Sequence, residues 1–316
     1  MELSIVISLY NEEESLKELV SWIHEALAGN VSSYEIIMVD DGSKDSSWAV
    51  IQEMAAEDKT IRGIRFRRNY GKSAALYCGF EAAQGDIVVT MDADLQDDPT
   101  EIPEMMRMIR EDGYDLVSGW KKIRHDNKLT KNLPSKLYNA TARKVTGIKL
   151  HDMNCGLKAY RKDVVKNIEV FGEMHRFIPY LAKEAGFAKI GEKVVHHRKR
   201  KYGKSKFGLN RFVNGFLDLM TIWFLQVFGR QPMHLFGLLG IINFMAGIII
   251  AIWLIVKKLV LQSHGQVFRA VTDQPLFYLA LLAVVIGTLL FLTGFLGEMI
   301  TRNSSNRNTY NIKERI

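Results

Sequence analysis

Short apolar runs and amphipathic segments alternate along the first 120 residues of the chain. The apolar runs are rich in β-branched residues and predict strands, whereas the segments between them repeat their apolar residues with a helical period. Strands are expected at 2–9, 34–40, 61–67, 86–92 and 115–118, and helices at 12–27, 45–57, 72–83 and 101–111. A polar stretch at 123–132 predicts a loop over the sheet edge, and a further helix is expected at 137–145. This alternation is typical of an α/β domain with a mostly parallel sheet covered by helices on both faces.

Two long apolar runs without charges follow in the last third of the chain. Leu235–Val256 and Leu276–Gly297 are each long enough to cross a bilayer as a helix, and neither keeps the polar face of a surface helix. The aromatic and apolar segment before them predicts amphipathic helices in the membrane interface, with an ordinary core helix as the alternative. We therefore expect an α/β domain at 1–206, juxtamembrane helices at 207–232, two transmembrane helices within 233–300 and a basic tail at 301–316.

Positive charge is concentrated beside the apolar runs. The net charge is +7, and the segment 196–211 contains seven Lys or Arg residues and no acid. Positive residues near membrane spans favour the cytoplasm, so both termini are expected there and the loop between the spans outside, although that loop also carries cations. The strand-like N-terminus lacks the basic start of a signal peptide. No nucleic-acid partner is expected, because the basic cluster adjoins a membrane segment and no nucleic-acid motif is present.

Four successive strands end in polar motifs, and the carboxyl ends of parallel strands meet at one edge, where α/β sheets bind ligands. Asp92, Asp94 and Gln96 alternate, so an extended strand end would aim all three at one point. Their hard oxygen ligands suit Mg²⁺ or Mn²⁺ bridging a diphosphate, whereas a solvated acidic turn is the alternative for this motif alone. Lys72 at a helix start could meet a phosphate, although no P-loop motif is present. The two lone cysteines suggest neither a disulfide framework nor a metal cluster.

Together these motifs resemble the GT-A (Rossmann-like) domain of glycosyltransferase family 2, and more narrowly its polyprenyl-phosphate hexose synthases. They are Ser-Leu-Tyr-Asn-Glu (8–12), Val-Asp-Asp-Gly-Ser (39–43), Asn-Tyr-Gly-Lys (69–72) and Met-Asp-Ala-Asp-Leu-Gln-Asp-Asp-Pro (91–99). The segments 151–161 and 198–206 resemble two further signatures of the narrower group, which includes dolichol-phosphate mannose synthase. The two apolar runs match its bacterial polyprenyl-phosphate glucosyltransferase branch. The chain departs from many relatives at Ser8-Leu9, where they have a proline, and at Leu157, where Phe is usual.

The resemblance implies roles for individual residues of this chain. It implies a nucleotide held by Tyr10, Glu12, Asp40, Lys72 and Asp92, and a divalent metal held by Asp92, Asp94 and Gln96. It places Arg198, Lys204 and Lys206 at the lipid phosphate, together with Arg124 from the 123–132 loop. Asp94 would act catalytically through the metal. Asp152 is the candidate for positioning or weak base chemistry, with a buried capping aspartate as the alternative.

The expected reaction is an inverting, metal-dependent transfer of glucose from UDP-glucose to undecaprenyl phosphate at the cytoplasmic face of the inner membrane. A phosphate monoester has a second pKa of about 6 and is largely anionic at neutral pH, so a general base is optional. GDP-mannose or another nucleotide sugar is the first alternative. A processive polysaccharide synthase and an inactive scaffold are more distant ones, and the chain lacks the Q-x-x-R-W motif of the former. Glycines in both apolar runs would also allow close helix packing in a homo-oligomer.

Overall fold

The structure is a computed structural model that describes residues 1–122, 140–143, 146–199, 201–202, 220, 224, 232–265, 269–303 and 312–316. The chain forms two compact units. The first comprises Met1–Leu219 and Arg307–Ile316, and the second comprises Met220–Asn306. The tail expected as a separate basic segment at 301–316 therefore returns in large part to the first unit. The juxtamembrane segment 207–232 lies almost entirely outside the described residues.

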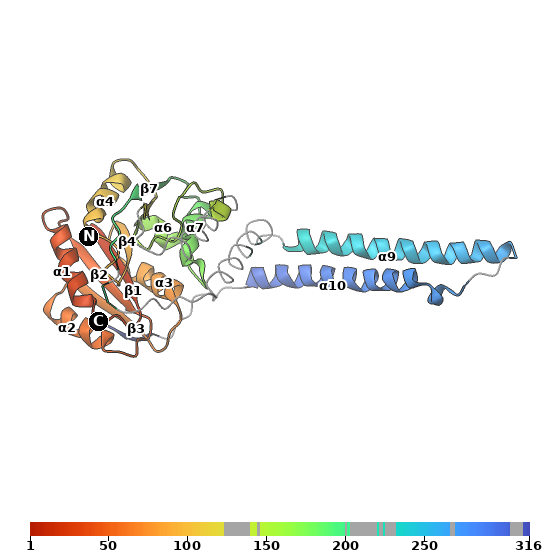
Figure 1. Cartoon of the computed structure of the whole chain (residues 1–316), viewed down its shortest axis with the longest axis horizontal. Helices are drawn as coiled ribbons and strands as arrows, with labels where there is room; N and C mark the ends of the chain where they lie inside the picture. The colour runs from red at the N-terminus through yellow and green to blue at the C-terminus, as the bar shows by residue number, and fades with distance from the viewer. Residues whose placement is uncertain are drawn as a thin grey trace. The chain divides into compact units, whose positions relative to one another are not determined.

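An eight-stranded sheet forms the centre of the first unit, with the strand order β7-β5-β6-β4-β1-β2-β3-β8 (Figure 1). Its strands are β1 (Leu3–Leu9), β2 (Tyr34–Asp40), β3 (Ile61–Phe66), β4 (Ile87–Asp92), β5 (Leu116–Trp120), β6 (Lys158–Arg161), β7 (Ile190–Val194) and β8 (Ile312–Arg315). The pairs β1–β2, β1–β4, β2–β3 and β5–β7 are parallel, whereas β6 and β8 pair antiparallel with their neighbours. The mostly parallel sheet is confirmed, and its three last strands in chain order were not predicted.

Helices cover both faces of the sheet, as the sequence predicts (Figure 1). The helices are α1 (Leu16–Leu27), α2 (Ser47–Glu57), α3 (Lys72–Ala82), α4 (Ile102–Arg110), α6 (Lys162–Asn167) and α7 (Ile178–Glu184), with the 3-10 turns η1 (Pro99–Glu101) and η3 (Met174–Phe177). One core contains apolar residues of α1, α2 and α4, and the other contains those of α3, α6 and α7. Of the helix predicted at 137–145, residues 140–143 are described and helical.

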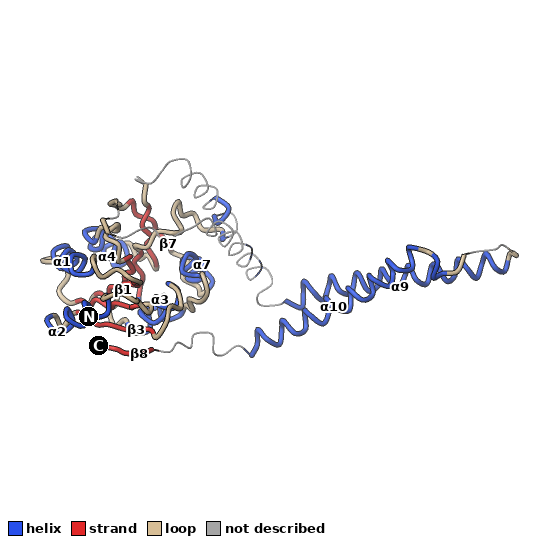
Figure 2. Tube along the Cα trace, turned by 60° about the horizontal axis from the view of Figure 1, so that its bottom comes forward, coloured by secondary structure: helices blue, strands red, loops and turns tan. Residues whose placement is uncertain are grey.

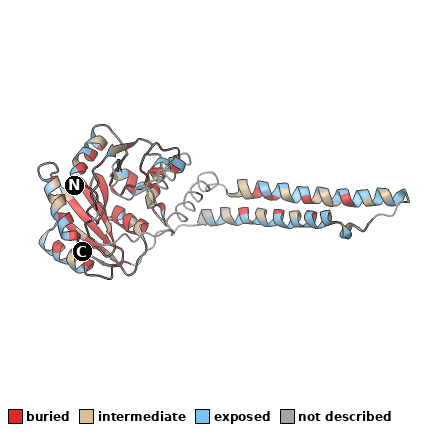
Figure 3. Ribbon diagram, viewed as in Figure 1, coloured by how far each residue is buried: buried red, intermediate tan, exposed pale blue. Residues whose placement is uncertain are grey.

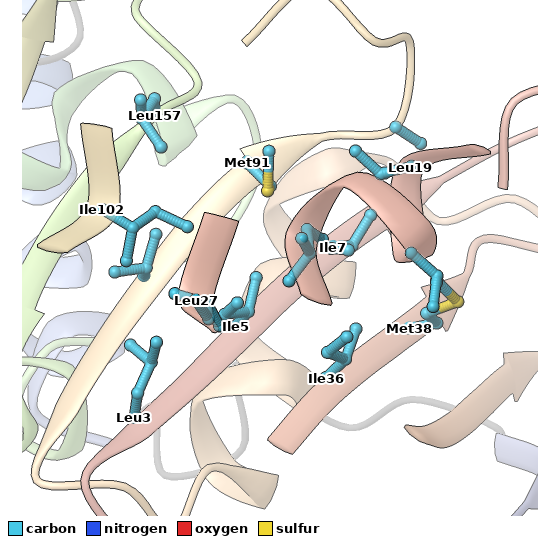
Figure 4. Packing of buried hydrophobic residues seen from close by; sticks show 14 of the residues in the cluster. Leu3, Ile5, Ile7, Leu19, Leu27, Ile36, Met38, Met91, Ile102 and Leu157 are labelled. Carbon is cyan, nitrogen blue, oxygen red and sulfur yellow. The ribbon is translucent and has the colours of Figure 1, made fainter. Parts of the chain in front are cut away.

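Alternation along the strands explains how the two cores form. Leu3, Ile5 and Ile7 of β1 pack with Leu19 and Leu27 of α1 on one face (Figure 4). The intervening Val6 packs on the opposite face, against residues of α3. Figure 3 shows the strands buried and the outer helix surfaces exposed. Successive side chains of a strand point to opposite faces, so a two-sided apolar strand has to be covered by helices on both sides.

The register of the central strands aligns the ends that carry the polar motifs. Ser8 pairs with Asp92 of β4, and Leu9 pairs with Asp40 of β2. Helix α1 begins at Leu16 rather than at Glu12, because the chain turns first: Asn11 has a φ of 53°. Its amide donates to Ser43 Oγ at 2.8 Å, which ties the turn after β1 to the turn after β2. The expected meeting of motifs at one sheet edge is therefore confirmed for these three strands.

The second unit contains two long helices, α9 (Pro232–Ser263) and α10 (Pro275–Asn303), which enclose both predicted apolar runs. They pack along each other, and both are long and apolar enough to cross a membrane. A Cβ atom on Gly240 would lie 2.7 Å from the carbonyl oxygen of Gly287. Gly247 and Gly294 also approach the other helix. These glycines thus serve packing within one chain, and homo-oligomerisation stays a prediction.

Candidate active site

A cleft of about 290 Å³ lies at the carboxyl edge of the sheet, where β1, β2 and β4 end. It is lined by Ser8, Leu9, Tyr10, Glu12, Asp41, Asn69, Gly71, Lys72, Ala75, Asp92, Ala93 and Asp94. All four strand-end motifs contribute to this lining. The predicted site residues Tyr10, Glu12, Lys72, Asp92 and Asp94 are therefore brought together by the fold.

Lys72 is the first residue of α3, and its ammonium group forms an ion pair with the carboxylate of Asp92. Burial alone would raise the pKa of Asp92, but the ammonium groups of Lys72 and Lys121 outweigh burial and hold this pKa well below its ordinary value. The carboxylate is thus ionised at neutral pH. The N-terminus of α3 also opens into the cleft, and free amide groups with the helix dipole favour anionic ligands there.

The aspartate that faces the cleft is Asp41 rather than the predicted Asp40. Asp40 is fully buried, and its carboxylate accepts a hydrogen bond from the amide of Ser43 at 2.8 Å. Asp41 lines the cleft and accepts hydrogen bonds from the amides of Tyr70 and Gly71 at 2.7 and 2.9 Å. Burial raises the pKa of Asp41 to about 6. Asp41 therefore fixes the turn before α3 and is the better placed of the two to meet a nucleoside.

Strand β4 ends at Asp92 and a turn follows, so the expected extended run through Gln96 is not formed. Leu95 has a φ of 61°, and the amide of Gln96 donates to Asp94 Oδ1 at 3.3 Å across the turn. Gly156 lies directly beside Asp92, because a Cβ atom at position 156 would come within 2.5 Å of Asp92 Oδ2. The glycine of the 151–161 motif is therefore needed to leave room for this carboxylate.

Asp97 is a buried residue of this turn that the sequence reasoning missed. It is fully buried and pairs with the ammonium of Lys121 at 2.7 Å, at the end of β5. Its Oδ2 also lies 3.4 Å from the amide nitrogen of Asp92. Asp97 thereby joins the turn after β4 to the end of β5, and β6 lies between these two strands in the sheet. The run of acids at 92–98 was a signal for it, but the partner Lys121 is distant in sequence.

His175 of η3 was also missed, and it lies against the start of α3. Its amide and its ring Nδ1 contact Ser73 Oγ at 3.0 and 3.1 Å. Burial, and then the positive charges of Lys72 and Arg176, hold the pKa of His175 well below its ordinary value. The ring is thus neutral at physiological pH, and it anchors the helix turn that presents Lys72 to the cleft.

The carboxylates of Asp92 and Asp94 both line the cleft, and their oxygen chemistry fits a hard divalent cation. Among the described residues no three His, Cys, Asp or Glu side chains gather as a complete cage. Mg²⁺ is usually bound through one or two carboxylates together with substrate phosphates, so two carboxylates are a sufficient protein share. Gln96, the third predicted ligand, is not among the residues that line the cleft, and its role at the metal stays a prediction.

The remaining predicted residues lie outside the cleft lining or outside the described residues. Asp152 is buried, and its Oδ1 accepts a hydrogen bond from the amide of Asn154 at 3.1 Å, closing a local turn. The guanidinium of Arg198 lies over the ring of Trp22 in α1, 3.8 Å from its centroid. Arg124, Lys204 and Lys206 fall outside the described residues. Their roles at the lipid phosphate stay predictions.

Comparisons with known proteins agree with this fold and cleft. The sequence profile of Glycosyl transferase family 2 matches residues 4–169. Dodecaprenyl-phosphate galacturonate synthase of Rhizobium johnstonii is 34% identical over 304 residues, which cover 96% of this chain and 88% of that protein. Undecaprenyl-phosphate 4-deoxy-4-formamido-L-arabinose transferase of Shewanella sediminis is 38% identical over 303 residues, covering 95% and 87%.

A solved structure supports the fold of the first unit. Glucosyl-3-phosphoglycerate synthase of Mycobacterium tuberculosis, crystallised with Mn²⁺, UDP and glucosyl-3-phosphoglycerate, superposes with a TM-score of 0.52 at 20% identity. The match covers 71% of this chain and 78% of that chain, and at this identity it speaks for the fold alone. The strand-end motifs, the GT-A fold and the family profile agree. The chain is a glycosyltransferase and belongs to glycosyltransferase family 2.

Proposed function

We propose that the protein transfers a sugar from a nucleoside diphosphate to a polyprenyl phosphate, with inversion at the anomeric carbon. The main support is that two relatives named for polyprenyl-phosphate substrates match about 95% of the chain, through both the cleft-bearing unit and the apolar helices. The names of these relatives specify galacturonate and a formamido-arabinose. UDP-glucose therefore stays one candidate donor among several, with GDP-mannose as another.

Different residues in and around the cleft would bind the nucleotide donor and the metal. Tyr10, Glu12 and Asp41 would hold the nucleoside, while Lys72 and the start of α3 would bind the diphosphate. Asp92, Asp94 and Gln96 would hold Mg²⁺ or Mn²⁺, which supplies Lewis-acid stabilisation of the leaving diphosphate. The acceptor phosphate is already anionic near neutral pH, so positioning and charge neutralisation matter more than proton removal. The buried Asp152 fits a positioning role.

We also propose that the cleft faces the cytoplasm at the inner membrane, with α9 and α10 as a transmembrane hairpin. The support is the pairing of β8 with β3: the amides and carbonyls of Gly63 and Ile316 exchange two hydrogen bonds of 2.8 Å (Figure 2). A segment that follows both apolar helices can join this sheet only if it lies on the same side of the membrane. Donor nucleotides are made in the cytoplasm, which fixes that side in the proposal.

The rival functions differ in what they require of the cleft and the helices. A processive synthase needs a channel through the membrane, and a single hairpin within one chain does not enclose one. An inactive scaffold has no use for an ionised Asp92 paired with Lys72 in a cleft. Transfer of labelled sugar to lipid would therefore separate the proposed enzyme from both alternatives.

The proposed function is tested by radiolabelled transfer with the purified full-length protein, Mn²⁺ or Mg²⁺ and undecaprenyl phosphate. UDP-glucose, GDP-mannose, UDP-N-acetylglucosamine and UDP-galacturonate are offered in parallel. We expect label in the organic phase from one donor, and a loss of at least about 100-fold in Asp94→Asn, the order of magnitude typical for removing a group that stabilises transition-state charge. Transfer by Asp94→Asn at the wild-type rate would contradict the metal role. Failure of every donor despite nucleotide binding would indicate a rarer sugar or a different acceptor.

A further inference from the structure

Residues His196–Tyr202 follow β7 and run across the turn after β4; they are called the basic strap here, and Arg200 lies outside the described residues. The strap is attached to the turn by its backbone. The amide of Arg198 donates to the carbonyl of Gln96 at 2.9 Å, and His197 forms a β-bridge with Asp97. This segment carries the first of the cations assigned to the acceptor phosphate. The turn after β4, which carries predicted metal ligands, is therefore bonded directly to the basic strap, which carries a predicted ligand of the acceptor phosphate.

The other end of the strap is attached to α1. The guanidinium of Arg198 lies over Trp22 and pairs with Asp98 at 3.6 Å. Lys201 pairs with Glu18 at 2.7 Å, and the hydroxyl of Tyr202 donates to the same carboxylate at 3.2 Å. Helix α1 thus holds the strap through Trp22 and Glu18, in addition to the contacts that the strap makes with the segment after β4. These contacts provide a place to loosen the strap without touching the predicted metal residues.

Gln96 is the residue at which turn and strap meet through a side chain. Its Nε2 donates a hydrogen bond to the carbonyl of Arg198 at 3.2 Å, and it lies 3.5 Å from His197 Nε2. A primary amide has a donor end and an acceptor end. With Nε2 engaged by the strap, Oε1 is the end left to serve as an oxygen ligand. A glutamate at this position would keep the oxygens and lose the donor.

We propose that Gln96 is a positioning residue that couples the donor and acceptor sites through the two ends of its amide. Oε1 serves the divalent cation while Nε2 holds the basic strap in place for the acceptor phosphate. This inference rests on the proposed function for its acceptor, but its structural part, the attachment of the strap, does not. Because coupling between two sites is reciprocal, occupancy of the cation site steadies the strap, and a fixed strap favours cation binding.

The test compares Gln96→Glu with Asp94→Asn and the matched control Glu18→Gln in the full-length protein. Amide hydrogen exchange of the strap is measured without ligands, then with Mn²⁺ and UDP. Loss of one hydrogen bond changes an equilibrium by about fivefold, so Gln96→Glu should speed exchange at the Arg198 amide about fivefold. Asp94→Asn should leave this ligand-free exchange unchanged. Glu18→Gln should speed exchange near Tyr202 without altering it at Arg198.

Mn²⁺ binding, followed by electron paramagnetic resonance in the presence of UDP, gives the second measurement. Gln96→Glu keeps its oxygen ligand and should bind Mn²⁺ within about threefold of wild type, whereas Asp94→Asn should bind at least about tenfold more weakly. In transfer assays Gln96→Glu should raise the acceptor KM about fivefold, the equivalent of one hydrogen bond. Unchanged strap exchange in Gln96→Glu would overturn the proposal. A wild type without transfer, but with these exchange differences, would count against the proposed function alone.

Discussion

At the scale of single residues, the position of one carboxylate depends on the absence of one side chain. Asp92 has room only because residue 156 is glycine, since a Cβ atom there would lie 2.5 Å from Asp92 Oδ2. Gly156→Ala should therefore displace the carboxylate from Lys72 and weaken nucleotide and Mn²⁺ binding by at least about tenfold, as for loss of a charge-assisted contact. Titration calorimetry measures this. Wild-type affinity in a variant with an unchanged melting temperature would contradict it.

Asp41 predicts a pH dependence of stability. Its folded pKa of about 6 lies above its ordinary value of 3.8, because burial disfavours the charged form. Between about pH 4 and pH 6, the carboxyl of Asp41 is therefore protonated in the folded protein and ionised in the unfolded chain. Its contribution to the free energy of unfolding is full below about pH 4 and is lost as pH rises through about 6.

Asp41→Asn, which stays neutral, should gain stability relative to wild type between about pH 4 and pH 7.5. A shift of two pKa units corresponds to roughly 3 kcal/mol at most. Thermal unfolding of both proteins in one detergent across this pH range measures the difference, and other titrating groups cancel in the comparison. A difference that stays constant with pH would show that this carboxyl does not carry the effect.

The sequence was sufficient to locate the polar residues at the strand ends. It was insufficient to locate the buried residues that hold them in place. Tyr10, Lys72 and Asp94 could be found because each closely follows a predicted strand, and parallel strands bring such positions to one edge. Asp97 and His175 could not, since their roles depend on Lys121 and Ser73, which lie far away in the chain. Such buried pairs arise from tertiary packing and leave no periodic pattern.

At the scale of elements, local pattern located the first five strands within one or two residues, because apolar β-branched runs are long there. Strand β6 and strand β8 escaped notice, since each has four residues and mixes charged with apolar positions. The sequence also does not show that Asp41, and not Asp40, lines the cleft. Asp40 is the last residue of β2 and is fully buried, whereas Asp41 begins the turn that follows the strand.

The packing of α9 against α10 predicts a contrast between two glycines of one helix. A side chain on Gly240 would collide with backbone atoms of Gly287 and Phe291 at 2.7 and 2.8 Å. A Cβ atom on Gly237 would have the flexible side chain of Met233 as its nearest neighbour, at 3.1 Å. Gly240→Val should therefore separate the helices and cost about 1–3 kcal/mol, as overpacking does, while Gly237→Val should cost less. Melting temperatures in detergent compare them, and equal losses would refute the close approach.

At the scale of the whole molecule, strand β8 predicts the orientation of the chain in the membrane. Because β8 and β3 share a sheet, position 315 lies on the side of the cleft. In the proposed transmembrane hairpin, position 263 at the end of α9 lies on the other side of the membrane. In intact cells a membrane-impermeant thiol reagent should label Ser263→Cys and spare Arg315→Cys. In permeabilised cells the reagent should label both variants. The native cysteines, Cys78 and Cys155, are buried and give a low background. Labelling of Arg315→Cys in intact cells would contradict the orientation.

The late position of β8 in the chain also orders the events of biogenesis. Translation proceeds from the N-terminus, so β3 is made long before its outer neighbour, and until β8 arrives it presents an unpaired strand edge, a site prone to aggregation. Both apolar helices have to be synthesised in between. Strand β8 can therefore pair with β3 only after the two apolar helices have brought the C-terminal tail to the side on which β3 folded. In the proposed topology, a chain in which only one of the two helices crosses the membrane would leave the edge of β3 unpaired.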